Sequence, residues 1–403
     1  MFGYIDRIEV DYVVNGRATG GDFANRMNQV SFDPGLLRPM VMDDGHKYCW
    51  VANGKMKKNE AGEMVPDRDP VPLSRLIGNG MVPPIYNASS LPYQVWQKLD
   101  AAVTKASRSR LQAWNDLAAA NTYGGFNGMA VTGIIKDVMT DPGNAKIDMD
   151  KLSNDVSDAP LFTPDILPLP IIHAGFEIGP RMLAMSRNSG MPIDTSSAEA
   201  CGRRCAETLE KMTIGIDDFS TLTIGSSSTF DHRGIYGFRT QPHRITKTDV
   251  TAVGSFVAST FLSDVIAMKE LARAKNFFGP FVLYYSTSWD QYLARDYYAT
   301  VTAAGVVAPT QTVLQRVSQI QGISKIQMLD FFTSASELLL VQMTSDTVRA
   351  VDGMDWTPIQ YDKPGGGGLV YRVMGIKVPD LKSGFVGTSL TDRACGIVHG
   401  TIS

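Results

Sequence analysis

The sequence predicts an α+β fold, on three observations. Apolar residues recur at three- and four-residue steps from Trp96 to Ala106, which predicts a helix that starts near Leu91, with Leu111 and Trp114 as an optional continuation. A helix-start signal at residues 196–199 and a long apolar-patterned segment at residues 251–276 predict two more helices. Short apolar runs after Gly279-Pro280 are typical of strands. The sequence shows no internal repeat, so the mixture indicates one α+β chain rather than an array of repeats.

Residues 1–90 are predicted to form an extended arm. Turn-forming pairs such as Asn15-Gly16 and Asp33-Pro34-Gly35 indicate extended segments rather than a packed helical domain. Tyr48 and Trp50 belong to the buried type of side chain, which argues against a solvated linker. We expect this arm to become ordered by lying on the main body or on another copy of the chain.

The segment between residues 158 and 192 is rich in proline at its start. Four prolines occur between Asp158 and Pro170, and the run from Ile171 to Met182 is the better strand candidate. We expect that strand to open a long hairpin-like excursion that ends near Pro192.

Residues 196–199, Ser-Ser-Ala-Glu, match a capping box with Ser196 as the capping residue. The helix behind it is expected to end at Gly215. Its predicted apolar stripe consists of Ala198, Cys201, Cys205, Leu209 and Met212. The residues expected off that stripe are Arg203, Arg204, Glu207 and Glu210.

The remaining elements are predicted from apolar runs and turn residues. Residues 364–368, Pro-Gly-Gly-Gly-Gly, are expected to form a flexible hinge. A helix is predicted at Gln311–Ile320. Strands are predicted at Phe281–Tyr285, Ile326–Phe331, Leu338–Met343, Leu369–Val378 and Cys395–His399.

The composition argues against several classes of protein. The chain has 403 residues and a net charge of −3, without the basic stripe expected of a protein that grips nucleic acid. Four scattered cysteines are too few for a disulfide framework, and Cys201 and Cys205 fit core packing better than metal binding. Charged residues interrupt the first fourteen positions and every long apolar stretch, so neither a secretory signal nor a membrane span is expected.

The motifs that carry catalysis or metal binding are not matched. The five histidines have no zinc spacing, and His232 in Asp231-His232-Arg233 fits a solvated turn. Residues 225–229 lack the closing glycine of a nucleophile elbow. The aspartates at 148, 150 and 155 do not have the spacing of a calcium loop. We therefore predict no catalytic, metal-binding or cofactor-binding residues, and a protein that is not an enzyme.

Several segments resemble encapsulin shell proteins, a family that shares the Hong Kong 97-like fold with the major capsid proteins of tailed bacteriophages. The resemblance is carried by residues 167–178 (LPLPIIHAGFEI) with Arg181, and by residues 190–196 (GMPIDTS) with the helix behind them. It continues in three further segments, residues 91–100 (LPYQVWQKLD), 234–238 (GIYGF) and 279–283 (GPFVL). The matches run in order over roughly three quarters of the chain.

The resemblance implies a division of the chain into named parts. After the N-terminal arm, the expected parts are 91–157 as an N-terminal helix and connecting segment, 158–195 as an extended loop, 196–278 as a peripheral domain with a long spine helix, 279–353 as an axial domain, and 354–403 as a return to the peripheral domain and extended loop. The extended loop has little core of its own, so it is expected to be stabilised by lying across a neighbouring copy.

The function that this resemblance implies is structural. Encapsulins usually begin near the helix found here at Leu91, so the additional ninety residues favour a phage major capsid protein, an icosahedral head around double-stranded DNA. The alternative is an encapsulin-like compartment around a cargo enzyme, and a third hypothesis is a hydrolase with an unfamiliar fold. The expected partners are other copies in hexamers and pentamers, packaged DNA without sequence specificity, and separate scaffolding, portal or decoration proteins. The expected location is the virion, assembled in the host cytoplasm.

Six residues are predicted to contact neighbouring copies. In the extended loop these are Phe176, Glu177 and Arg181, where the guanidinium could pair with a carboxylate of the next copy. At the start of the spine helix they are Asp194, Ser196 and Glu199. A Ser196→Ala replacement is expected to cost about 1 kcal/mol through loss of the helix cap.

Overall fold

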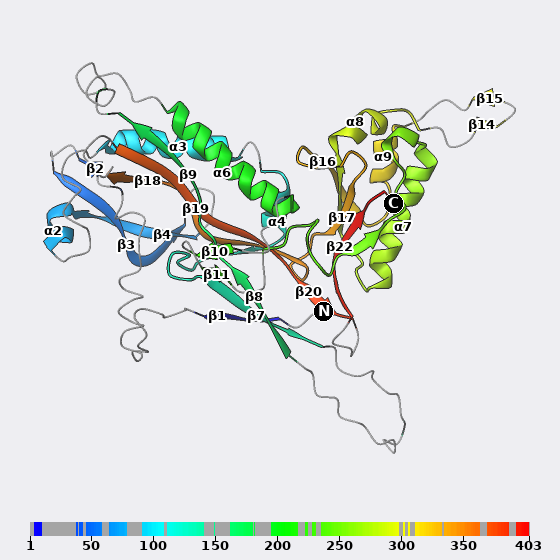
Figure 1. The fold of residues 1–403 in the computed structure, drawn as a ribbon, viewed down its shortest axis with the longest axis horizontal. Helices are drawn as coiled ribbons and strands as arrows, with labels where there is room; N and C mark the ends of the chain where they lie inside the picture. Colours follow the sequence, from blue (N-terminus) through cyan, green and yellow to red (C-terminus); the bar gives the residue numbers. More distant parts are fainter. Residues whose placement is uncertain are drawn as a thin grey trace.

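The structure is a computed structural model of the chain. It describes residues 4–9, 38, 40–42, 46–58, 64–78, 91–108, 111–140, 149, 162–179, 181, 195–216, 222–224, 228–230, 235–297, 301–302, 305–306, 311–332, 334–362, 369–386 and 392–402. Figure 1 shows two lobes and a hairpin that projects from them. Helices and strands are both abundant, so the predicted α+β class is confirmed.

A four-stranded sheet forms the centre of the first lobe (Figure 1). In spatial order its strands are β6 (Thr122–Tyr123), β18 (Val348–Asp362), β19 (Leu369–Leu381) and β9 (Ile172–Ile178). The two long strands, β18 and β19, pair antiparallel, and β9 pairs antiparallel with β19. The predicted hinge at residues 364–368 lies between β18 and β19, outside the described residues.

Two helices, α3 (Tyr93–Arg108) and α6 (Ser196–Ile214), cover one face of this sheet (Figure 1). The whole predicted stripe of α6 is buried, which the alternation of small apolar residues and charges had indicated. At Gly202 the two helices approach closely, since a Cβ there would lie 3.1 Å from the carbonyl oxygen of Val103. The helix ends as predicted at Gly215, which has the left-handed φ of 83°.

The start and one side of α6 differ from prediction. The capping residue is Thr195, and its side chain makes no capping hydrogen bond, so Ser196 is the first helical residue instead of the cap. The expected loss of about 1 kcal/mol for Ser196→Ala assumed that Ser196 is the capping residue, a position that Thr195 occupies instead. Glu210, predicted to lie off the apolar stripe, is buried with 1% of its surface exposed. The reason is a set of backbone N–H groups that approach it from another part of the chain.

The second lobe is built on a five-stranded mixed sheet. In spatial order its strands are β12 (Ile245–Lys247), β22 (Ile397–Gly400), β17 (Leu338–Gln342), β13 (Phe281–Ser286) and β16 (Ile323–Leu329). Three helices pack around it, α7 (Ala258–Ala274), α8 (Thr287–Leu293) and α9 (Val313–Ser318), and a short 3-10 turn, η3 (Val253–Ser255), precedes α7. The strands and helices predicted in this region occur with shifted ends, and the helix predicted at residues 251–276 begins only at Ala258, after η3.

Strand β13 contributes side chains alternately to the cores of the two lobes. Every one of its residues is buried. Val282 and Tyr284 belong to the core that fills the first lobe, whereas Leu283 and Tyr285 belong to the core of the second. Because successive side chains of a strand point to opposite faces, one short strand contributes to both cores.

Two segments lie in a different part of the fold from the one expected. Strand β12 and helix α7, expected in the peripheral domain, pack with the sheet of β13. The final strand β22 pairs with β17 in that same sheet, whereas residues 354–403 were expected to return to the peripheral domain and extended loop. Pairing between strands so distant in sequence depends on tertiary packing, which local pattern does not encode. The exact domain boundaries remain a prediction.

The projecting hairpin consists of β7 (Gly133–Met139) and β8 (Phe162–Pro168), and β1 (Tyr4–Glu9) pairs along the outer edge of β7. This hairpin begins earlier than the excursion predicted from residue 171. That predicted strand is β9, which lies in the first-lobe sheet because it pairs with β19 from Ile172↔Gly375 to Ile178↔Leu369. The expected continuation to Pro192 falls mostly outside the described residues.

The front of the chain forms a sheet of its own in addition to β1. In spatial order its strands are β4 (Met64–Pro72), β3 (Lys47–Lys58), β2 (Met40–Val41) and β5 (Leu91–Pro92), and α2 (Leu73–Gly78) follows β4. Arg38 fastens this sheet to α3, since it pairs with Asp100 at 2.6 Å and lies 4.8 Å from the Trp96 ring centre. Part of the predicted arm thus lies on the body of the same chain. The smaller strand pairs are β10 (Leu222–Ile224) with β11 (Ser228–Phe230), β14 (Val301–Thr302) with β15 (Gly305–Val306), and β20 (Ser383–Phe385) with β21 (Arg393–Cys395).

Candidate functional site

Side chains that can bind metals or act as nucleophiles are the first candidates for a site within the described part of the chain. Among those residues no cluster of three or more His, Cys, Asp or Glu is arranged to hold a metal ion. Burial raises the pKa of the Cys205 and Cys395 thiols to about 12, so neither is a thiolate at neutral pH. None of the described helices is long and apolar enough to cross a bilayer. The segments around His232 and the aspartates at 148, 150 and 155 fall outside the described residues.

Five of the six predicted contact residues belong to the described part of the chain. Phe176 is half-buried because its ring stacks on Tyr371, with ring centres 5.3 Å apart, so it supports the sheet of the first lobe. The other four described candidates are exposed, namely Glu177, Arg181, Ser196 and Glu199. Asp194 lies outside the described residues. Their contacts with a neighbouring copy remain a prediction.

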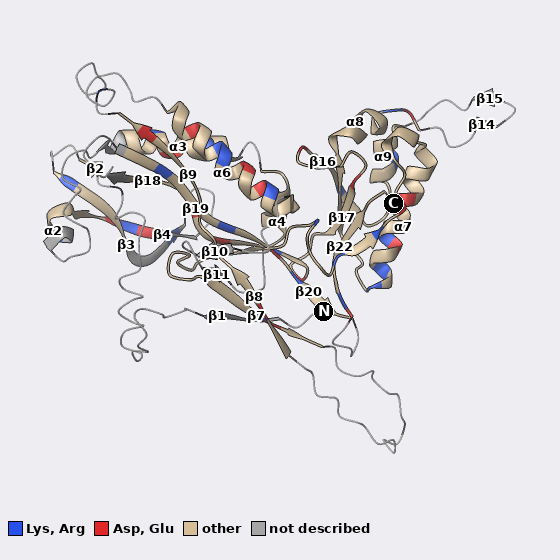
Figure 2. Ribbon diagram, viewed as in Figure 1, with Lys and Arg blue, Asp and Glu red and all other residues tan. Residues whose placement is uncertain are grey.

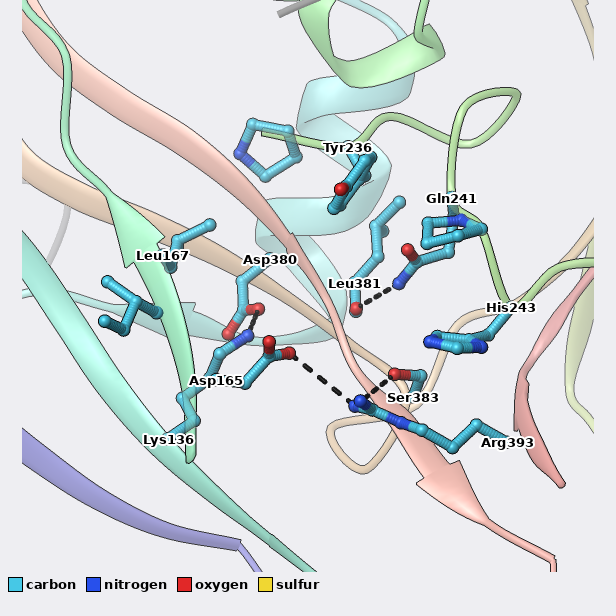
Figure 3. Close-up of a pocket in the computed structure, with 13 residues that line it drawn as sticks. Lys136, Asp165, Leu167, Tyr236, Gln241, His243, Asp380, Leu381, Ser383 and Arg393 are labelled. Atoms are coloured by element: carbon cyan, nitrogen blue, oxygen red, sulfur yellow. Dashed lines mark hydrogen bonds and ion pairs between the residues drawn. The ribbon is translucent and has the colours of Figure 1, made fainter. Parts of the chain in front are cut away.

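A cavity lined by several charged and polar side chains lies at the base of the hairpin (Figure 3). This partly open cavity of about 210 Å³ is lined by the hairpin, by the loop that contains Tyr236, Gln241 and His243, and by the ends of β19, β20 and β21. The side-chain amide of Gln241 donates to the carbonyl of Leu381 at 2.8 Å and ties that loop to β19. This junction is therefore the place where hairpin, first lobe and second lobe are joined.

A buried ion triad fastens strand β7 at this junction. Lys136 of β7 donates to one carboxylate oxygen of Asp380, and Arg349 binds the other through Nε at 3.0 Å and Nη2 at 2.9 Å. All three side chains are nearly inaccessible, with exposed fractions of 6% for Lys136, 1% for Asp380 and 3% for Arg349. Burial alone would raise the pKa of Asp380, but the two cations more than offset it and hold that pKa below its usual value.

A second, looser ion pair fastens strand β8. Asp165 of β8 lies 3.6 Å from Nη2 of Arg393, and the same nitrogen donates to the Ser383 hydroxyl at 2.9 Å (Figure 3). Nearby His243 has its pKa lowered by burial and by Arg393, with Asp165 acting in the opposite direction. Each strand of the hairpin is thus tied to the body by its own ion pair.

The two lobes are held together by two carboxylates that the sequence pattern did not reveal. Glu210 of α6 accepts hydrogen bonds from the backbone N–H groups of Gln112, Ala113 and Trp114, at 3.1, 2.6 and 3.2 Å. It thereby caps the start of α4 (Ala113–Ala120), where backbone donors lack partners within the helix. Burial raises the pKa of Glu210, although these hydrogen bonds act to lower it.

Asp116 of the same helix reaches into the second lobe. It accepts from the Tyr284 hydroxyl at 2.8 Å and pairs with Lys325 Nζ at 2.6 Å. Tyr284 also stacks on Phe238, with ring centres 5.8 Å apart. Burial, followed by the charge of Asp116, raises the pKa of Tyr284 well above its usual value, so its hydroxyl stays a donor. Hydrogen bonds therefore connect α6 to α4 through Glu210, and α4 to β13 of the second lobe through Asp116.

Acid should weaken the second lobe through one histidine. Burial, together with Arg244 and Arg239, lowers the pKa of His399 to about 4, and Nε2 of His399 lies 3.9 Å from Glu337. In the unfolded chain His399 binds a proton near pH 6.5, whereas in the folded chain it does so only near pH 4. The free energy of unfolding therefore keeps its full value above pH 6.5 and decreases as the pH falls towards 4. We expect His399→Gln to lose less stability than the parent between pH 7 and 4.5, measured by urea unfolding. His173→Gln, which changes an exposed histidine of β9, serves as the control, and an equal acid sensitivity of all three chains would contradict the assignment.

The chain shows similarity to solved shell proteins. A virus-like particle protein from Pyrococcus furiosus is 13% identical, with 75% of this chain and 98% of that chain covered and a TM-score of 0.49. The capsid of Myoviridae phage XM1 is 9% identical, with coverages of 71% and 91% and a TM-score of 0.49. The capsid of a native GTA particle is 12% identical, with coverages of 73% and 91% and a TM-score of 0.45.

Among curated proteins nothing matches the chain. One family model does match it, a family of unknown function named DUF6260, over residues 87–364. That span includes the first-lobe helices, the projecting hairpin and most of the second lobe. The chain therefore belongs to the DUF6260 family.

Proposed function

We propose that this chain is the major capsid protein of a tailed phage, a structural subunit that assembles with copies of itself into an icosahedral head. The observation that carries the proposal is the hairpin β7–β8, whose strand β8 exposes two large apolar side chains on the face turned away from the body. On that face Phe162 is 54% exposed and Ile166 is 38% exposed. Exposed apolar faces of this kind mark surfaces that bind other proteins.

The geometry of the hairpin favours a contact between unlike surfaces of two copies. One face of it, which carries Ile134 and Leu167, packs on the body of its own chain, whereas Phe162 and Ile166 on the opposite face are exposed, so that face can lie on a different surface of a neighbouring copy. A contact of this heterologous kind generates rings or closed shells when the rotation between copies closes. Many such contacts per particle then stabilise the wall collectively, even where each contact is weak.

The charge distribution supports a shell subunit rather than a protein that binds nucleic acid tightly through its phosphates. The net charge is −3, and on the exposed faces of α3 and α6 acidic and basic side chains are interspersed (Figure 2). Such a wall encloses double-stranded DNA without sequence-specific contacts. In this account the head forms in the host cytoplasm, becomes part of the virion, and uses separate scaffolding, portal and decoration proteins. The chain has no catalytic role in it.

The test is negative-stain microscopy of the full chain expressed alone, with nucleic-acid absorbance read on the same fraction. Closed particles of uniform diameter are expected. Particles isolated from infected cells should contain double-stranded DNA. Particles that instead enclose a single bacterial enzyme would support a compartment of the encapsulin type. A small oligomer that never closes would contradict both shell functions.

A further inference from the structure

The two ion pairs at the hairpin base use residues that face each other. Lys136 and Asp165 are direct cross-strand partners in the β7–β8 ladder. Directly opposed residues of an antiparallel pair have Cβ atoms about 5 Å apart, close enough for a cation and a carboxylate to pair. In this structure each of them pairs with the body instead, Lys136 with Asp380 and Asp165 with Arg393. Figure 3 shows both side chains pointing to the same side of the hairpin, towards the cavity.

We propose that these residues form an exchangeable ion latch, which lets the outer part of the hairpin leave the body without stranding a buried charge. In the closed state Lys136 pairs with Asp380 and Asp165 with Arg393. In the open state Lys136 pairs with Asp165 across the hairpin. This inference concerns a movement within one chain and does not depend on the proposed function.

The groups left behind on the body keep partners when the latch opens. Asp380 retains both bonds to Arg349, which itself lies 4.6 Å from the Tyr123 ring centre. Arg393 retains its bond to the Ser383 hydroxyl and lies 5.2 Å from the Phe385 ring centre. An unpaired buried charge is the largest electrostatic obstacle to separating two packed surfaces, and the exchange removes that obstacle for Lys136 and Asp380. Arg393, whose side chain is 15% exposed, keeps a neutral partner in the Ser383 hydroxyl.

The packing defines where the hairpin would pivot. Ile134 and Leu167, which flank the latch on the side of the body, are buried in the first-lobe core. The backbone N–H of Leu169 donates to the carbonyl of Thr132 and closes the base of the hairpin. Beyond the latch, Val138 is buried, but Phe162 on the other face is exposed. The pivot therefore lies between the Ile134–Leu167 pair and the Lys136–Asp165 pair.

The neighbouring cavity gives the latch room to exchange. Lys136, Asp165, Asp380 and Arg393 all line it, together with polar groups of Tyr236 and His243. Charged side chains can change partners there without repacking of the apolar core, because the space beside them is already open. In a closed shell this freedom would allow copies in unlike positions to set the hairpin at different angles, a use that rests on the proposed function.

The decisive comparison is between Asp165→Asn and Arg393→Met. Both remove the same Asp165–Arg393 ion pair, but only Asp165→Asn removes the partner that Lys136 needs in the open state. The measurement is hydrogen exchange by mass spectrometry on the full purified chain, read at the amides of residues 135–139 and 162–166. The amides of α6 serve as an internal standard for global unfolding.

The latch predicts opposite results for the two variants. Exchange at the hairpin should become about threefold slower in Asp165→Asn and faster in Arg393→Met. In a Lys136→Met background no lysine needs a partner, so Asp165→Asn should there speed exchange. Faster exchange in Asp165→Asn alone, matching Arg393→Met, would show that Asp165 only holds the hairpin closed and would overturn the proposal. Asp165→Ser tests the same point should the Asn variant not fold.

Discussion

Replacing Asp380 by Ala is expected to destabilise the folded chain by about 4 kcal/mol. The change leaves Lys136 and Arg349 as two buried cations without a carboxylate between them. Their mutual repulsion and lost hydrogen bonds both act against the folded state, and the hairpin base should be affected first. The free energy of unfolding in urea, monitored by tryptophan fluorescence, measures the loss.

The matched control for this prediction is Asp392→Asn. Asp392 also pairs with a cation, Lys275 at 2.9 Å, but both side chains are substantially exposed. Exposed pairs contribute about 0–1 kcal/mol, so the control should unfold close to the parent. Equal destabilisation of the two variants would contradict the argument from burial. The Asp380 contribution should also fade in strong acid, since a carboxylate with a lowered pKa stabilises the fold only above that pKa.

The second large effect is expected at Glu210. Glu210→Ala removes the acceptor for three backbone N–H groups at the start of α4 and leaves them without partners in the protein interior. Unsatisfied buried donors and a lost charged acceptor together should cost about 3 kcal/mol. Because α4 carries Asp116, which binds Tyr284 and Lys325, the loss should loosen the connection between the lobes.

Glu210→Gln and Glu207→Ala are the controls for this prediction. The glutamine keeps one carbonyl oxygen near the backbone donors, so its loss should be smaller than that of alanine. Glu207 lies one turn earlier on α6 in a more exposed position, with a 3.8 Å pair to Arg203. Its removal should change stability by less than about 0.5 kcal/mol. Differential scanning calorimetry gives all three values, and an alanine variant as stable as the glutamine variant would refute the capping role.

Local pattern predicted the elements whose stability depends on their own sequence. The α6 stripe and its glycine stop were correct because a 3.6-residue periodicity states which face is buried. The strands near residues 281–286 and 338–342 were correct because they are short apolar runs bounded by turn residues.

The hairpin could not be predicted in the same way. Its strands β7 and β8 are separated by residues 140–161, so no tight-turn signal marks them as partners. The proline-rich stretch that was expected to lead into the excursion is largely β8 itself. Edge strands tolerate proline, and Pro164 and Pro168 lie on the edge of a sheet in the order β1-β7-β8.

The buried ion pairs and the Glu210 cap could not be predicted from the sequence either. Lys136 and Asp380 are separated by 244 positions, and Glu210 and Gln112 by 98. A lone charge in a strand or helix gives no sign that a partner from a distant segment will bury it. For Glu210 the sequence does contain one indication of burial, because this residue directly follows the buried Leu209 near the core-facing side of α6.

The central claim is that the β7–β8 hairpin joins copies of this chain into a closed shell. An electron cryomicroscopy reconstruction of particles formed by the full chain tests it most directly. The account predicts an icosahedral wall in which Phe162 and Ile166 of each hairpin are buried on a neighbouring copy. A reconstruction in which those side chains stay in solvent, or an assembly that does not close, would contradict it.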